Sequence, residues 1–212
     1  MERLKRTIGI ALTVMFFAGT AAAQTWGTVL RTGTNGVSLE VVRSFGLRFN
    51  ARVGGSYFTY SYTDTGSKDY IMDADLRFSS VTAMVDWFPR RGIFHFTGGV
   101  IYNLNDADAV MIPKESHDVG GRTYTPEMLG TLSAAFGFKP VAPYLGIGFG
   151  NAHVSSGFVF DIGIMYQGPP SVDLTANRLL EPSTEQAPII EKNLEWFRLY
   201  PVVSLGYVLV LN

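Results

Sequence analysis

The fold is decided by a stretch that reads FVFDIGIMYQ from Phe158 to Gln167. Large apolar side chains occupy every second position of this stretch, and Asp161 and Gly163 lie between them. Alternation with a period of two is typical of a β-strand that has one apolar and one polar face. The sequence therefore predicts an all-β protein, because the same alternation recurs over residues 47–57, 131–138 and 144–150.

The polar faces of these segments are rich in Gly, Ser and Thr rather than in Lys and Glu. A soluble β-sandwich turns its polar face to water, whereas a membrane barrel turns its apolar face to lipid and small or polar side chains inward. Only 17% of the residues are charged, which is low for a soluble domain. These features favour a closed antiparallel up-and-down transmembrane β-barrel, with a soluble periplasmic β-barrel binding protein as the alternative.

The first 23 residues have the build of a secretory signal peptide. Arg3, Lys5 and Arg6 precede an apolar run over residues 8–19, and three alanines follow at 21–23. We therefore expect residues 1–23 to be removed and residues 24–212 to form one barrel domain outside the cytoplasm. The chain has no cysteine, which excludes disulfides, thiolate metal sites and a lipidated amino-terminal cysteine.

The strand count depends on a parity argument. The alternation indicates strands at about 36–43, 47–62, 70–88, 93–105, 128–138, 142–151, 158–167 and 197–210. The last two would then run in the same direction, which an up-and-down barrel does not allow. Adding strands over 26–31 and 172–176 restores parity, so the sequence predicts ten strands. Eight strands, with residues 169–196 as a periplasmic excursion, are the alternative.

The connections and one helix complete the predicted architecture. A short helix is expected near residues 185–197, where apolar side chains follow helical spacing. Because outer-membrane barrels have tight periplasmic turns and longer external loops, loop length predicts the side of each connection. The short links are 44–46, 89–92, 139–141 and 168–170, and the longer links are 64–68, 106–126, 152–157 and 177–195.

The candidate functional residues are charges on the polar strand faces. An isolated charge inside a narrow barrel is very unfavourable, so these groups should pair with one another. They form either a salt-bridged plug or a polar constriction that conducts small solutes. The set comprises Glu40, Arg48, Arg52, Asp86, His95, Asp161 and Asp173.

Aromatic residues near the strand ends are expected to anchor the barrel at the membrane interfaces. The candidates are Tyr57, Trp87, Phe88, Tyr166 and Tyr207.

Catalysis receives little support from the sequence. It contains no phosphate-binding loop, zinc-ligand spacing or nucleophile elbow, so we expect no catalytic residues, cofactor or metal. An outer-membrane barrel enzyme that acts on lipid or peptide is the alternative, with His95, His117 and His153 as the available bases.

The partners follow from charge and location. A formal net charge of −1 gives no reason to expect nucleic acid. The expected partners are outer-membrane lipid, lipopolysaccharide and the barrel assembly machinery, and a monomer is the simplest oligomeric state.

Four segments carry a resemblance to a known group of proteins. They are DADLR at 73–77 leading to DWFP at 86–89, APYLGIGFGN at 142–151, and residues 160–168 and 200–206. The chain resembles small proteobacterial outer-membrane β-barrel proteins of the OmpA/OmpW-like type and, more loosely, CarO-type porins, which have been proposed to admit small basic amino acids. The resemblance implies a barrel in the outer membrane of a Gram-negative bacterium, with a structural role or slow passage of small polar solutes through a narrow charged lumen.

Overall fold

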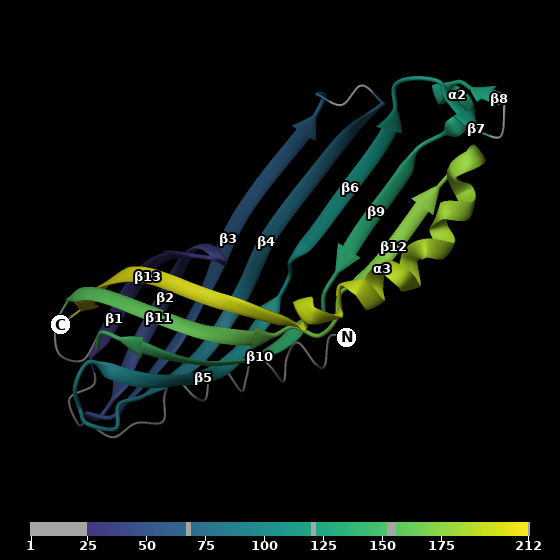
Figure 1. Cartoon of the computed structure of the whole chain (residues 1–212). Helices are drawn as coiled ribbons and strands as arrows, with labels where there is room; N and C mark the ends of the chain where they lie inside the picture. Colours follow the sequence, from purple (N-terminus) through teal and green to yellow (C-terminus); the bar gives the residue numbers. More distant parts are fainter. Residues whose placement is uncertain (1–24, 67–68, 120–121, 152–155, 212) are drawn as a thin grey trace, which may run out of the picture.

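The computed structural model describes residues 25–66, 69–119, 122–151 and 156–211, so the predicted signal peptide lies outside the described residues. Within the described part of the chain, eight antiparallel strands form a closed barrel (Figure 1). They follow the order β4-β3-β2-β1-β13-β11-β10-β5, and pairing of β5 with β4 closes the ring. The eight are β1 (Trp26–Gly33), β2 (Gly36–Phe45), β3 (Phe49–Asp64), β4 (Tyr70–Trp87), β5 (Phe94–Asn103), β10 (Val141–Phe149), β11 (Gly157–Tyr166) and β13 (Leu199–Leu211).

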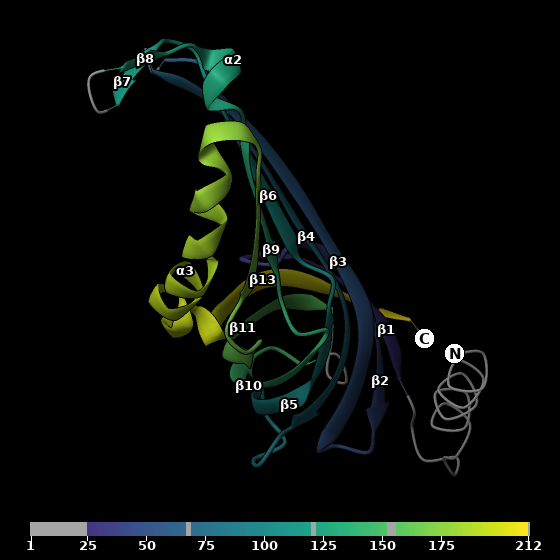
Figure 2. The same cartoon turned by 90° about the vertical axis from the view of Figure 1, so that its right-hand side faces the viewer.

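Strand β4 changes partner halfway along its length. Residues 80–87 pair with β5 inside the barrel, whereas residues 70–77 pair with β6 (Asp106–Pro113). Strands β9 (Leu132–Gly137) and β12 (Ser171–Ala176) follow β6 in the same sheet. We call residues 58–64 of β3, residues 70–79 of β4 and strands β6, β9 and β12 the sheet extension, which rises from one end of the barrel (Figures 1 and 2).

Short helices and a hairpin complete this end of the molecule. Helices η1, α3 and η2 lead from β12 back to β13, and α3 lies beside the sheet extension in both views (Figures 1 and 2). The predicted helix near 185–197 is thus confirmed in place, with α3 at its centre. The bounds are β7 (His117–Val119), β8 (Arg122–Tyr124), α2 (Pro126–Leu129), η1 (Arg178–Gln186), α3 (Ala187–Asn193) and η2 (Glu195–Arg198).

The prediction of a ten-stranded barrel is wrong, and the eight-strand alternative gives the correct count. Residues 26–31 do belong to a barrel strand, but residues 132–137 and 172–176 pair only in the sheet extension. Strands β11 and β12 both run away from the same barrel end, and helices η1, α3 and η2 supply the return. The sequence analysis added a strand so that the chain could return to the opposite end of the barrel. In the structure, these helices make that return instead.

The prediction from loop length also assigned some connections to the wrong end of the barrel. The turns at 46–48 and 89–92 lie at the barrel end opposite the sheet extension, as their shared shortness suggested. The short links 139–141 and 168–170 instead lie at the extension end, next to the far ends of β5 and β13. Each of these two turns joins a barrel strand to a strand of the sheet extension, so a short link does not mark the end opposite the extension, and residues 169–196 belong to the extension and its helices.

The outer face of the barrel is apolar and exposed. Leu145 of β10 and Phe158 of β11 are 74% and 76% exposed and point away from the lumen. Exposed apolar side chains arranged all around a closed barrel are the surface that lipid covers in membrane barrels. In the described residues, no helix has the length and apolar character needed to cross a membrane.

Candidate functional site: a charged layer in the lumen

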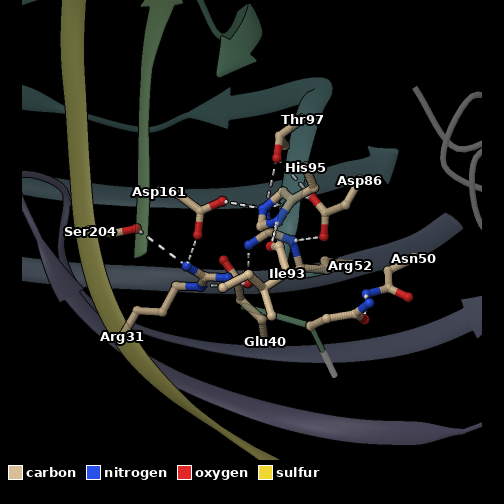
Figure 3. Close-up of polar contacts among 11 residues, drawn as sticks. Arg31, Glu40, Asn50, Arg52, Asp86, Ile93, His95, Thr97, Asp161 and Ser204 are labelled. Carbon is tan, nitrogen blue, oxygen red and sulfur yellow. Dashed lines mark hydrogen bonds and ion pairs between the residues drawn. The ribbon is translucent and has the colours of Figure 1, made fainter. Parts of the chain in front are cut away.

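Six charged or titratable side chains from six strands meet inside the barrel (Figure 3). Each sits on the inward face of its strand, because the alternation of the strand places its sequence neighbours on the lipid side. All six are buried. We call this group the lumen network, and it comprises Arg31 (β1), Glu40 (β2), Arg52 (β3), Asp86 (β4), His95 (β5) and Asp161 (β11).

Arg52 lies at the centre of the lumen network and contacts carboxylates from three other strands. Its Nη1 donates to Glu40 Oε2 at 3.0 Å, and its Nη2 donates to Asp161 Oδ1 at 3.2 Å. Towards Asp86 the contact has two points, with Nε 2.8 Å from Oδ2 and Nη2 2.9 Å from Oδ1. A planar guanidinium group suits such multiple contacts better than a lysine ammonium group does.

Arg31 provides the second cation. Its Nε donates to Glu40 Oε2 at 3.1 Å, and its Nη1 pairs with Asp161. The same Nη1 lies 3.4 Å from the hydroxyl oxygen of Ser204 in β13. Glu40 and Asp161 are thus each shared between two arginines, and the lumen network joins strands on opposite sides of the barrel.

His95 links Asp161 to the barrel wall. Its Nε2 lies 3.1 Å from Asp161 Oδ1, and its Nδ1 lies 3.4 Å from the backbone oxygen of Ile93. Both ring nitrogens therefore face acceptor oxygens. The ring of Phe88 covers the imidazole, with 4.9 Å between the ring centroids.

Apolar side chains fill the lumen on both sides of this charged layer. On the side of the 46–48 and 89–92 turns lie Val29, Val42, Val159 and Val208. On the side of the sheet extension lie Met84, Ile101, Ala142, Tyr144 and Met165. Such layers separate the charges from bulk water, which strengthens each ion pair and makes an unpaired charge very unfavourable.

Two small cavities flank the lumen network. The cavity towards the sheet extension measures about 50 Å³, and the one on the opposite side measures about 10 Å³. Arg31 and Arg52 line both cavities. Since one water occupies roughly 30 Å³ of liquid, these spaces hold at most a few water molecules.

A glycine makes room for the network. A Cβ atom at Gly148 would lie 2.5 Å from His95 Nε2 and 2.7 Å from Asp161 Oδ1. Any side chain at this inward position would therefore push the histidine and the carboxylate apart.

The structure brings together five of the seven charges that the sequence singled out: Glu40, Arg52, Asp86, His95 and Asp161. The other two lie elsewhere. Arg48 is exposed in the turn between β2 and β3, and Asp173 is exposed on β12 of the sheet extension. Arg31 was missed, although the alternation of Leu30, Arg31 and Thr32 places it on the inward face of a predicted strand.

Four of the five predicted interface aromatics lie where an interface anchor should, and one does not. Tyr57, Trp87, Tyr166 and Tyr207 are exposed on the outer face of the barrel. Phe88 is buried instead, because alternation places it on the same inward side as Asp86, where it packs against His95.

Asp86, His95 and Asp161 also form a group with metal-ligand chemistry, since their ligand atoms lie within 4.8 Å of one another. The guanidinium group of Arg52 contacts both carboxylates of this group. A metal cation would have to displace that guanidinium, so the group does not fit a metal site. Of the other candidate bases, His117 lies in β7, away from the barrel, and residue 153 falls outside the described residues.

Comparisons with known proteins were made for sequence and for structure. No protein-family model matches the chain, and no curated protein matches it in sequence. Among solved structures, the chain is similar to CarO2 of Acinetobacter baumannii, with a TM-score of 0.59 and 18% identity over 88% of this chain and 98% of that one. CarO of the same organism has a TM-score of 0.55 and 19% identity, over 86% of this chain and 95% of that one.

A third similar structure comes from Thermus thermophilus. A major outer membrane protein of Thermus thermophilus matches with a TM-score of 0.50 and 14% identity, over 90% of this chain and 100% of that one. Identities this low establish the fold alone. The predicted resemblance and outer-membrane localisation agree with these neighbours and with the apolar outer face of the barrel. The chain has the fold of outer-membrane β-barrel proteins.

Proposed function

We propose that this chain is an integral outer-membrane protein whose barrel is closed by the lumen network and serves as a structural anchor for the sheet extension. The observation that carries this proposal is the position of Arg52, which contacts carboxylates from β2, β4 and β11 across the full width of the lumen. Apolar layers on both sides of the charges support it further. Outer-membrane lipid, lipopolysaccharide and the barrel assembly machinery are the proposed partners.

Electrical recording in planar lipid bilayers tests the closed lumen. We expect the purified wild-type protein to produce no steady conductance steps, since ions cannot pass a layer in which every charge is paired. Replacing Arg52 with Ser should produce openings, because it removes the central side chain and leaves three carboxylates that attract water and cations. Arg77→Ser is the matched control, since Arg77 is exposed in the sheet extension. Regular conductance steps from the wild-type protein would contradict the proposal.

Slow passage of small polar solutes is the second candidate function. It is favoured by the two cavities, which are separated by the arginines that line both of them. A change in the rotamer of Arg31 or Arg52 would join the cavities for a short time. Liposome-swelling rates measure such passage: faster swelling with wild-type protein than with protein-free liposomes, altered by Arg31→Gln, would support it. Equal rates would leave the closed anchor as the function.

A further inference from the structure

The sheet extension has two edges, and their surroundings differ. At the β12 edge, α3 lies alongside and Glu191 Oε1 accepts a hydrogen bond from the backbone N–H of Val172 at 2.8 Å. At the β3 edge, β2 begins at Gly36 and its pairing with β3 reaches only as far as Tyr57. Among the described residues, no strand pairs with residues 58–64 on that side, where β3 is the outermost strand (Figure 1).

An open edge of this kind is a template for another strand. Residues 58–64 read FTYSYTD, with aromatic and hydroxyl side chains that favour β-structure and neither proline nor glycine. Seven residues in extended form span about 23 Å. An added strand would continue the position of β2 in the sheet, directly above Gly36.

The inner face next to this edge is apolar and uncovered. Phe58, Tyr60 and Tyr62 lie on the face that continues the lumen side, and they are 44%, 51% and 49% exposed. Their pairing partners on β4 are Phe78, Leu76 and Ala74, which are also apolar. An added strand would therefore bury apolar side chains at every second position on this face.

The outer face next to the same edge is acidic apart from Arg77, which pairs with Asp106 of β6. Asp73 lies opposite Thr63, and Asp75 lies opposite Ser61. On its other side, Asp75 faces Asp108 of β6, which places two like charges directly across from each other. Opposed like charges destabilise a sheet. The short Thr and Ser side chains of β3 leave space for a long cationic side chain on an added strand to reach these carboxylates.

From these three observations together we propose that the β3 edge of the sheet extension binds an extended polypeptide segment in which apolar and basic residues alternate. The segment adds one strand to the sheet, places its apolar side chains on Phe58, Tyr60 and Tyr62, and directs its Lys or Arg side chains to Asp73 and Asp75. Backbone pairing supplies affinity, and the alternation supplies selectivity.

The test uses the full-length protein in detergent micelles and a blocked nine-residue peptide in which valine and lysine alternate. Hydrogen exchange monitors the backbone amides. We expect saturable binding, slower exchange within residues 58–64, and no change within residues 171–176. A peptide in which valine and glutamate alternate, and a valine–lysine peptide in scrambled order, should bind much more weakly.

Charge variants distinguish this binding mode from non-specific binding of the peptide. Asp73→Asn combined with Asp75→Asn should weaken binding about tenfold at low salt. Glu181→Gln combined with Glu185→Gln changes the charge equally in the exposed helix η1 and should leave binding unchanged. If the first double variant failed to fold, the wild-type protein would give the same information, because affinity should fall as salt increases.

Several outcomes would overturn the proposal. Equal binding of the scrambled peptide, or unchanged affinity without both aspartates, would show that alternation and charge are irrelevant. Protection of residues 58–64 that rises with protein concentration in the absence of peptide would identify a second copy of the chain as the occupant. Protection that occurs only in nanodiscs containing lipopolysaccharide would assign this face to lipid.

Discussion

Arg52 shows how strongly one side chain depends on its surroundings in a narrow barrel. Its guanidinium group is surrounded by three carboxylates and has almost no access to bulk water. A buried ion pair contributes little compared with a well-packed apolar substitute, but removal of one partner leaves the other charges uncompensated. Replacing Arg52 alone should therefore destabilise the barrel far more than replacing it together with its partners.

Replacing Arg52 with Met should lower the free energy of unfolding by about 3–5 kcal/mol, the range seen when one partner of a buried ion pair is removed. Arg77→Met, which breaks the exposed pair between Arg77 and Asp106 at 3.4 Å, should cost less than about 1 kcal/mol. Urea unfolding in lipid vesicles measures both values. Equal losses in the two variants would mean that burial does not set the importance of these pairs.

The inward glycine offers an independent test of packing around the network. Gly148→Ala should destabilise the barrel by about 1–3 kcal/mol, because the added methyl group collides with His95 and Asp161. Gly98→Ala is the matched control, since a Cβ at Gly98 points outward and meets only Leu145 at 3.7 Å. A comparison of unfolding midpoints in urea shows whether the inward position alone is sensitive; similar midpoints would contradict the packing described for the lumen.

At the level of elements, β3 and β4 reverse the polarity of their faces along their length. In the barrel part of β4, Val81 and Val85 point outward and Thr82 and Asp86 inward. In residues 70–79 the outward side chains include Asp73, Asp75 and Arg77, and the inward ones are apolar. The reversal marks where lipid ends and water begins, since the same strand then has its polar face outside.

Helix α3 protects one edge of the sheet extension, and this protection can be removed. Glu191→Ala should speed hydrogen exchange at the Val172 amide and reduce local stability by about 1 kcal/mol, because that amide loses its acceptor. Glu185→Ala is the control, as Glu185 is exposed in η1. Unchanged exchange at Val172 would mean that α3 does not protect this edge.

The sequence predicted the barrel strands and five members of the lumen network because alternation alone fixes which side chains point inward. It failed where the answer depends on pairing between distant segments. Residues 70–88 read as one strand, but the sequence does not reveal that its halves pair with different strands. Arg48 was misplaced because the alternation stops at a turn, and Asp173 because it belongs to the sheet extension, where the faces are reversed.

At the scale of the whole molecule, a closed barrel and an open sheet share two strands. Among the described residues, the barrel has no free edge, whereas the extension has two, of which a helix protects the one at β12. Closure removes the unpaired backbone groups that a membrane cannot tolerate. The open sheet is compatible only with the water outside the membrane.

Closure predicts how the protein behaves in detergent. Unheated samples should migrate faster than boiled samples on a detergent gel, because the closed barrel stays compact until heat breaks its strand pairing. Extraction from membranes should require detergent, since the apolar outer face is otherwise exposed to water. Full solubility without detergent would favour the soluble β-barrel alternative and would contradict the membrane assignment.

The continuity of β3 and β4 also has a mechanical consequence. All 16 residues of β3 pair with β4, without interruption between the barrel and the sheet extension. A pulling force applied to the tip would therefore run along both strands together and load in shear the backbone hydrogen bonds that join them to β2 and β5. The extension cannot swing on a hinge as a tethered loop would. It acts as a stiff lever, and any load applied to it is transmitted directly to the barrel wall that holds Arg52 and Asp86.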